Sequence, residues 1–373
     1  MASLGICAIC GDERPTISNS LKVCLACIRN NPEKAIRYTD EAHVRTRDAF
    51  GLPPLPPSAD KGLECGMCGN QCVIGDGGKG FCGLVSNIGG RLIRNGGTPE
   101  KGILEWYYDP LPTNCVAWWF CPGCTGLGYP KYAKMRGAEK GYSNLAVFYG
   151  SCSFDCLFCQ NWHFRYLSQK LSPAVSASEL AEKVDAHVSC ICFFGGDPST
   201  QMPHALMTSE LALARAKGEK RILRVCWETN GNMQRNFLIK AADLSLMSGG
   251  VMKFDLKAWD ENLHRALCGV SNKRTLENFR VIGEEYFKER PDVPVLTAST
   301  LLIPGYIDAE EVERIASFIA SIDPKIPYTL LAFYPQYAMR DLPLIDRIQA
   351  EKCYQAARKH LNNVRLGNLH LIQ

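Results

Sequence analysis

The chain has 373 residues, enough for one large catalytic core with smaller extensions. Its 42 basic and 38 acidic residues give a formal net charge of +4, and no run of Lys or Arg argues for binding to nucleic acid. No apolar stretch approaches the roughly 18 residues of a membrane span, and the chain does not open with an export signal. We therefore expect a soluble, cytoplasmic protein without nucleic-acid or membrane partners.

Nineteen cysteines dominate the composition. In a reducing compartment, closely spaced cysteines are more often metal ligands than disulfides. Fourteen fall into four such groups, which are Cys7, Cys10, Cys24 and Cys27; Cys65, Cys68, Cys72 and Cys82; Cys115, Cys121 and Cys124; and Cys152, Cys156 and Cys159. The remaining five are dispersed among apolar or mixed neighbours, and we interpret them as structural thiols. These five are Cys190, Cys192, Cys226, Cys268 and Cys353.

The cysteine-rich amino-terminal part divides into two segments. Residues 1–50 hold the first group with the spacing C-x2-C-x13-C-x2-C, which is typical of a zinc ribbon closed around a structural Zn²⁺. An iron site for electron transfer is the alternative. Residues 51–143 form an extension that begins with a proline-rich linker. Within this extension, the group of Cys65, Cys68, Cys72 and Cys82 fits either zinc or an auxiliary [4Fe–4S] cluster. The group of Cys115, Cys121 and Cys124 has no evident fourth ligand and fits an auxiliary cluster with an open iron or structural thiols.

From residue 144 onward, short apolar runs alternate with amphipathic segments. The predicted strands cover 144–149, 189–194, 221–227, 250–255, 295–302 and 327–333. The predicted helices cover 177–187, 203–217, 233–246, 274–288 and 308–321. Successive right-handed βα units build a parallel sheet with helices outside. We predict an α/β fold, an open (β/α)6 partial TIM barrel over residues 144–340, with a helical extension over 341–373.

The fourth cysteine group carries the clearest chemistry. It has the spacing C-x3-C-x2-C directly after the first predicted strand, where α/β barrels place active-site loops. Three thiolates can hold three irons of a [4Fe–4S] cluster and leave the fourth open. This triad, with Phe158 just before Cys159, resembles the signature of the radical S-adenosylmethionine (SAM) superfamily. The resemblance implies catalysis at Cys152, Cys156 and Cys159, where the cluster cleaves SAM reductively to a 5′-deoxyadenosyl radical.

Polar segments follow the next three predicted strands, and the carboxyl ends of barrel strands converge on one mouth. In the superfamily, a Gly-Gly-acid segment after the second strand presents backbone groups to the methionine amino group. Later carboxylates and a lysine surround the carboxylate and ribose of SAM. The resemblance thus implies a cofactor-binding set made of Phe158, Gly195, Gly196, Asp197, Glu228, Thr229, Asn230, Asp255 and Lys257.

The order of these segments is similar to the glycyl-radical activase branch, whose type member activates pyruvate formate-lyase, and to AmmeMemoRadiSam-type activase-like proteins, over roughly residues 63–340. That similarity implies a post-translational modification enzyme. It would abstract hydrogen from a protein or peptide, at a backbone Cα, with an electron donor such as flavodoxin or ferredoxin. Two departures are Ala298-Ser299-Thr300, where the branch has a basic residue, and Tyr334, where the subgroup has His.

Two alternatives stay open at this stage. A cobalamin-dependent radical SAM C-methyltransferase would act on a protein residue. The segment Asp185-Ala-His187-Val-Ser-Cys190 lacks the glycine of a cobalamin loop, so His187 is better read as structural and cobalamin would bind elsewhere. A non-enzymatic iron–sulfur electron-transfer protein is the second alternative, although it would need neither the open triad nor Gly195 and Gly196.

Overall fold

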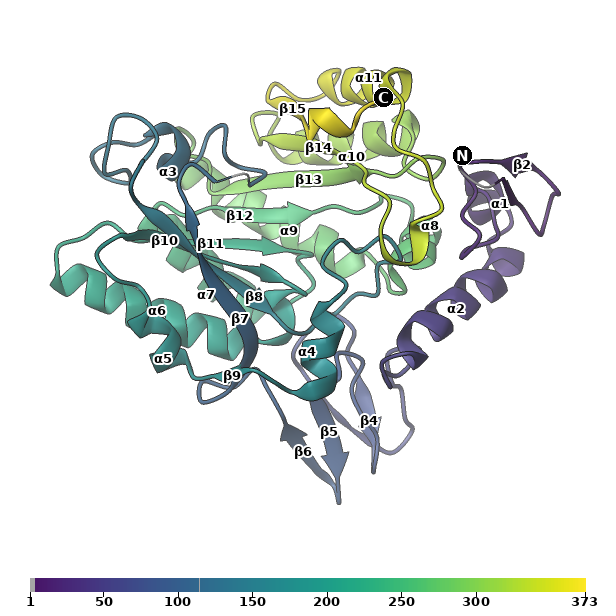
Figure 1. Cartoon of the computed structure of the whole chain (residues 1–373), viewed down its shortest axis with the longest axis horizontal. Helices are drawn as coiled ribbons and strands as arrows, with labels where there is room; N and C mark the ends of the chain where they lie inside the picture. The colour runs from purple at the N-terminus through teal and green to yellow at the C-terminus, as the bar shows by residue number, and fades with distance from the viewer. Residues whose placement is uncertain (1–3, 114) are drawn as a thin grey trace.

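The computed structural model describes residues 4–113 and 115–373. Its centre is a nine-stranded sheet in the order β15-β14-β13-β12-β11-β10-β8-β7-β9 (Figure 1). The strands are β7 (Gly102–Pro110), β8 (Ser143–Tyr149), β9 (Ala174–Val175), β10 (Val188–Gly195), β11 (Arg224–Thr229), β12 (Met252–Asp255), β13 (Leu296–Leu302), β14 (Tyr328–Ala332) and β15 (Val364–Gly367). The six predicted strands are confirmed, and they run parallel in chain order from β8 to β14.

Helices join successive strands and cover the outer face of the sheet, as the partial-barrel prediction requires. They are α4 (Phe164–Lys170), α5 (Ala177–Glu182), α6 (Met202–Gly218), α7 (Arg235–Ser248), α8 (Glu261–Cys268), α9 (Lys273–Glu285), α10 (Ala309–Ile322) and α11 (Arg347–Arg358). Helix α5 begins at a capping box formed by Ser176 and Glu179 but ends five residues earlier than predicted. Asp185 accepts a hydrogen bond from the N–H of His187 and closes a turn there, leaving His187 exposed.

The sheet is wider than the predicted six strands. Strand β7 comes from the cysteine-rich extension and pairs antiparallel with β8 and β9. Its aromatic residues Trp106, Tyr107 and Tyr108 favour a strand, although the surrounding sequence shows no regular pattern. At the other edge, β15 pairs parallel with β14, so the carboxyl-terminal segment supplies a strand as well as a helix.

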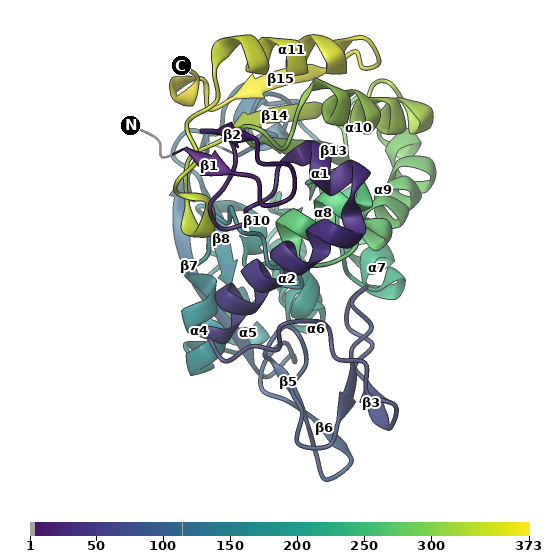
Figure 2. The same cartoon turned by 90° about the vertical axis from the view of Figure 1, so that its right-hand side faces the viewer.

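The amino-terminal elements lie at the carboxyl ends of the strands. They are β1 (Gly5–Ile6), β2 (Glu13–Arg14), α1 (Leu25–Asn30) and α2 (Pro32–Asp48), followed by the hairpins β3 (Gly62–Glu64) with β4 (Val73–Gly75) and β5 (Val85–Ile88) with β6 (Arg91–Arg94). Helices α1 and α2 both pack against α8, and Figure 2 shows α2 crossing in front of the sheet. The short helix α3 (Pro122–Thr125) lies at the opposite end of the sheet (Figure 1).

Along each strand, side chains point alternately outward, to the core beneath the helices, and inward, to the concave interior of the barrel. The rings of Phe193 on β10 and Trp227 on β11 stack 4.8 Å apart, and the indole N–H of Trp227 donates to Ser245 of α7. Neighbouring residues along a strand point to opposite faces. The residues beside Phe193 and Trp227 therefore face the concave interior. Within the described residues, no helix is both long enough and apolar enough to span a membrane.

Candidate active site at the carboxyl edge of the sheet

A cavity of about 160 Å³ opens where β8, β10, β11 and β12 end. All three cysteines of the predicted catalytic triad line it. So do seven of the nine predicted cofactor contacts, namely Phe158, Gly195, Gly196, Asp197, Asn230, Asp255 and Lys257. The fold thus brings together groups that lie more than 100 positions apart in the sequence, from Cys152 to Lys257.

Two hydrogen-bond donors face the sulfur of Cys152. The Sγ atom of Cys152 accepts from the backbone N–H of Phe154 (3.3 Å) and from the side-chain amide of Asn230 (3.6 Å). Such donors stabilise a thiolate, whereas burial raises the pKa of Cys152 and opposes an isolated one. A buried thiolate with donors on one side needs a cation on the other. The three sulfurs therefore fit a metal cluster held at three points.

Two glycines let the end of β10 pass close to the triad loop. At Gly196, a Cβ atom would lie 2.1 Å from the carbonyl oxygen of Ser151, and Gly195 has a φ of +106°. The N–H of Gly196 donates to Tyr149 and the N–H of Asp197 donates to Ser151, at 2.8 and 2.7 Å. Glycine is required at both positions, because a side chain would push this segment away from the triad.

Asp197 ties the ends of β10 and β11 together. Its carboxylate accepts hydrogen bonds from the N–H of Asn230 (2.6 Å), the N–H of Ser199 (2.8 Å) and the hydroxyl of Thr229 (3.1 Å). Burial raises the pKa of Asp197 to about 6, although these donors oppose the shift. Thr229 donates to Asp197 and does not line the triad cavity.

A lysine and a carboxylate face the triad from the end of β12. The Nζ atom of Lys257 lies 2.7 Å from Oδ2 of Asp255 and 5.8 Å from the centre of the Phe158 ring. Ser299 donates to the other oxygen of Asp255 at 2.6 Å. Burial opposes the charge on Lys257, but Asp255 and Cys156 raise its pKa. The pair offers a cation and a hydrogen-bond acceptor to a small molecule bound beside the triad.

Glu228 lies elsewhere. It faces the barrel interior, where Oε1 is 3.0 Å from Nζ of Lys253, and it does not line the triad cavity. The prediction placed it with SAM because it stands near the end of β11. The strand continues to Thr229, however, and the chain reaches the triad only at Asn230.

Sequence reasoning missed the role of Asp155, which lies inside the triad loop and is fully buried. Its carboxylate is held by Arg165 (2.6 Å), Thr46 (2.7 Å) and His43 (2.9 Å), and Arg47 approaches to 3.8 Å. Burial would raise its pKa, but Arg165, His43 and Arg47 lower it far below the ordinary value. The spacing of the triad drew attention to its cysteines, and no local signal marks the acid between them.

The first cysteine group forms a compact set at the amino terminus. The sulfur atoms of Cys7, Cys10, Cys24 and Cys27 all lie within 4.8 Å of one another, and those of Cys10 and Cys24 are 3.8 Å apart. Metal–sulfur bonds of about 2.3 Å in a tetrahedron give a sulfur–sulfur distance of about 3.8 Å. Although burial opposes ionisation, backbone N–H groups lower the pKa of Cys7 to about 6. This set can hold one metal ion.

The other groups are more open. Of the described residues, only the first group draws three or more sulfur atoms within 4.8 Å of one another. Burial raises the pKa of Cys82 to about 12, and the nearby thiols of Cys65 and Cys72 add to the shift. Cys115 and Cys121 line a cavity inside the barrel, whereas Cys124 packs behind them against Leu111. Cys124 also contacts Cys121, so the three thiols of the third group lie next to one another.

Comparison with known proteins agrees with this geometry. Residues 146–319 match the profile of the Radical SAM superfamily. A Methanocaldococcus jannaschii protein named for glycyl-radical enzyme activation is 30% identical over 222 residues, 57% of this chain and 76% of that protein. The isethionate sulfite-lyase activating enzyme of Desulfovibrio desulfuricans is 35% identical over 142 residues, 38% and 40% of the two chains.

The pyruvate formate-lyase 1-activating enzyme of Escherichia coli is 22% identical over 221 residues, 55% of this chain and 82% of that enzyme. Residues 146–319, which match the superfamily profile, contain the triad, the glycines at the end of β10 and the Asp255–Lys257 pair. Sequence, fold and site geometry agree, and the chain belongs to the radical SAM superfamily.

Proposed function

We propose that this protein abstracts a hydrogen atom from a backbone Cα of a protein or peptide. The observation that carries the radical chemistry is the single cavity lined by the triad, the Gly195–Gly196 segment and the Asp255–Lys257 pair. A [4Fe–4S] cluster bound there supplies the electron that cleaves SAM and so generates the radical that takes the hydrogen. The protein residues contribute binding, orientation and exclusion of water.

Each group has a role that follows from its chemistry. Cys152, Cys156 and Cys159 would hold three irons, since their sulfurs share one cavity and Cys152 already accepts two hydrogen bonds. Lys257 supplies a positive charge suited to the methionine carboxylate, and Asp255 an acceptor suited to a ribose hydroxyl. Asp197 and Thr229 act indirectly, because they fix the strand ends that carry Gly196 and Asn230.

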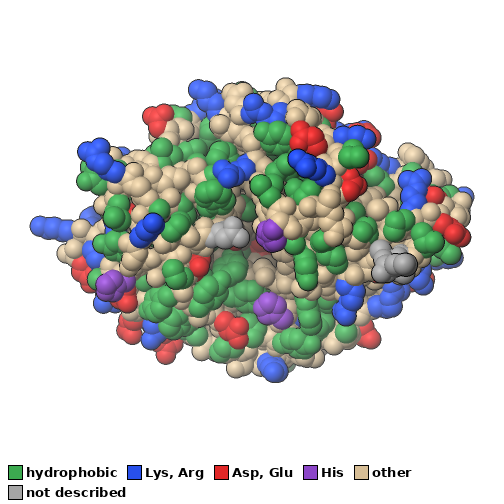
Figure 3. Space-filling view, turned by 45° about the horizontal axis from the view of Figure 1, so that its top comes forward, with side chains coloured by type: hydrophobic (Ala, Val, Ile, Leu, Met, Phe, Trp, Pro, Cys, Tyr) green, Lys and Arg blue, Asp and Glu red, His purple; other side chains and the backbone are tan. Residues whose placement is uncertain are grey.

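The names of the relatives support a polypeptide substrate. They are proteins named for the activation of a glycyl-radical enzyme, an isethionate sulfite-lyase and a pyruvate formate-lyase. Figure 3 shows a hollow near the middle of one face, with hydrophobic side chains along it. A hollow edged by apolar groups suits a polypeptide segment better than a small charged metabolite.

Isotope transfer tests the proposal. Extracts labelled with glycine deuterated at Cα would serve as substrate for the reduced enzyme with SAM, and we expect deuterium to appear in 5′-deoxyadenosine. Abstraction requires the donor carbon within roughly 3–4 Å of the radical, so the labelled position reports what the site presents. Extracts labelled only on leucine side chains are the matched control. Transfer from the side-chain label alone, or a cobalamin-dependent gain of one methyl group, would reject the Cα proposal.

Zn²⁺ is the ion we assign to Cys7, Cys10, Cys24 and Cys27, because the 3.8 Å spacing of Cys10 and Cys24 suits a closed tetrahedral site. The more open Cys65, Cys68, Cys72 and Cys82 group is assigned to an auxiliary iron–sulfur cluster. A flavodoxin or ferredoxin is the proposed electron donor to the triad cluster. The proposed hydrogen abstraction does not depend on these three assignments.

A further inference from the structure

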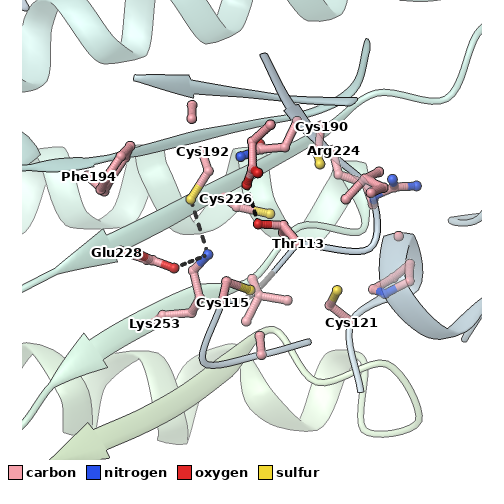
Figure 4. A pocket seen from close by; sticks show the side chains of 18 of the residues that line it. Thr113, Cys115, Cys121, Cys190, Cys192, Phe194, Arg224, Cys226, Glu228 and Lys253 are labelled. Carbon is pink, nitrogen blue, oxygen red and sulfur yellow. Dashed lines mark hydrogen bonds and ion pairs between the residues drawn. The ribbon is translucent and has the colours of Figure 1, made fainter. Parts of the chain in front are cut away.

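A second cavity of about 160 Å³ lies inside the partial barrel, between the strand residues Cys192 and Cys226 and the loop residues Cys115 and Cys121 (Figure 4). Five cysteines line it, two from the segment between β7 and β8 and three from the strands. They are Cys115, Cys121, Cys190, Cys192 and Cys226. The sequence interpretation treated the last three as separate structural thiols. The fold brings them together with the incomplete third cysteine group.

The strand thiols converge because of alternation and register. Cys192 on β10 is the direct partner of Cys226 on β11, and neighbouring strands lie about 4.8 Å apart. Cys190 stands two positions before Cys192 and so shares its face. Phe193 and Trp227, the next residues along each strand, point outward and stack. The three thiols are thus fixed on the concave face by the core packing behind them.

The loop thiols approach from the other side of the cavity. The Cys115 and Cys121 side chains are in hydrogen-bonding contact, and Figure 4 shows both beside the space that Cys192 and Cys226 face. Cys226 lines the same cavity as Cys121 and is the direct strand partner of Cys192. All nineteen cysteines are free thiols. The four named here are therefore available as ligands from two independent parts of the chain.

A buried cation compensates negative charge in this cavity. The Nζ atom of Lys253 donates to Sγ of Cys192 at 3.1 Å and pairs with Glu228 at 3.0 Å, with only 4% of the Lys253 side chain exposed. The ammonium group of Lys253 thus lies directly against a cavity sulfur, between Cys192 and Glu228. At the floor of the cavity, Arg224 pairs with Glu139 at 2.7 Å.

The dimensions favour a cluster over a single ion. A cavity of about 160 Å³ is several times the roughly 30 Å³ that one water molecule occupies in the liquid. Of the described residues, neither these thiols nor the triad draw three sulfurs within 4.8 Å, whereas the Cys7 group does. A single tetrahedral ion therefore suits the interior thiols less well than it suits the Cys7 group.

We propose that Cys115, Cys121, Cys192 and Cys226 hold a further iron–sulfur cluster inside the barrel, distinct from those assigned to the triad and to the Cys65 group. Cys192 and Cys226 each lie four positions before a residue of the triad cavity, Gly196 and Asn230. Four residues of strand span about 13 Å, so the interior cluster lies roughly that far from the SAM-binding groups. This site rests on its own thiols and does not depend on the Cα proposal.

Metal analysis of full-length variants tests the site. The parent carries Cys152, Cys156 and Cys159 replaced by Ala, which removes the triad cluster. The test variant adds Cys192→Ser and Cys226→Ser, which nearly preserve side-chain volume. After anaerobic reconstitution with iron and sulfide, we expect the test variant to bind about two to four fewer irons per chain than the parent, with an equal loss of sulfide. Electron paramagnetic resonance of the reduced parent should show a signal that the test variant lacks.

The matched control adds Cys353→Ser to the same parent, since Cys353 is a buried thiol on α11 outside the cavity. It should keep the parent's iron. A single Cys226→Ser variant covers the case in which the double variant misfolds, and it should retain its circular dichroism while its resonance signal shifts or disappears. Equal iron in parent and folded variants would overturn the proposal. So would the loss of zinc instead of iron.

Discussion

The Nδ1 atom of His43 on helix α2 lies 2.9 Å from Oδ2 of Asp155, inside the triad loop. The other ring nitrogen of His43 contacts the carbonyl oxygens of Arg265 and Ala266 at the end of α8. Helix α2 is therefore joined to the loop that carries Cys152, Cys156 and Cys159 and helps to position it.

Replacement of Asp155 by Ala should destabilise the protein strongly. Arg165 and Arg47 would remain buried without their counter-charge, and breaking such a buried pair costs about 3–5 kcal/mol. Denaturant unfolding of the metal-free protein measures the loss. Glu285→Ala is the control, because Glu285 forms an exposed pair with Arg235 and its loss should cost less than about 1 kcal/mol. Equal effects of the two substitutions would contradict this role for Asp155.

The contribution of Asp155 should depend on pH in one direction. Its pKa is lower in the folded than in the unfolded protein, so folding favours the ionised form. The stabilisation is complete above the unfolded pKa of about 3.9 and is lost as the pH falls below it. We expect the difference in unfolding free energy between the native protein and Asp155→Asn to be constant from about pH 5 to 8 and to shrink below about pH 4. A change between pH 6 and 8 would point to another group.

Replacement of Cys10 and Cys24 by Ser should release about one zinc per chain, because each supplies one of the four sulfurs of the compact set. A ribbon this short has little core without its metal, so helix α1 and its neighbours should become sensitive to protease. Metal analysis and limited proteolysis measure both effects. Cys353→Ser is the control and should change neither. Loss of iron with zinc retained would refute the zinc assignment.

The Glu139–Arg224 pair closes the amino-terminal end of the barrel and should matter for stability. Two hydrogen bonds of 2.7 and 2.9 Å join the side chains, both of which are buried. Glu139→Gln keeps the shape but leaves Arg224 without its charge partner, at a cost of about 3–5 kcal/mol in unfolding free energy. Glu284→Gln, in a surface pair with Arg280, should cost less than about 1 kcal/mol. A neutral Glu139→Gln variant would contradict this contribution.

Local signals in the sequence predicted much of the fold. Apolar runs predicted six strands, and the spacing of Cys152, Cys156 and Cys159 predicted where the site lies. Both signals are visible because strand periodicity and ligand spacing are properties of short segments. The depth of Glu228 in the barrel and the register of Cys192 with Cys226 depend on how strands align, which no short segment encodes.

Contacts between distant segments could not be predicted from the sequence either. His43 and Asp155 are 112 positions apart, and neither belongs to a recognisable motif. Strand β7 was missed because its partner β8 lies beyond a long cysteine-rich loop, so its aromatic residues had no visible pattern to join. Propensity alone identifies such a strand weakly, since packing on the sheet decides its conformation.

Reductive cleavage of SAM tests the central claim most directly. The protein would be reconstituted anaerobically with iron and sulfide, reduced with dithionite and incubated with SAM, and 5′-deoxyadenosine and methionine would be quantified. We expect both products from the native chain and none from the Cys152→Ala, Cys156→Ala, Cys159→Ala variant, which should also lack about four irons per chain. Undiminished 5′-deoxyadenosine from that variant, or none from a native chain with its triad iron bound, would contradict the account.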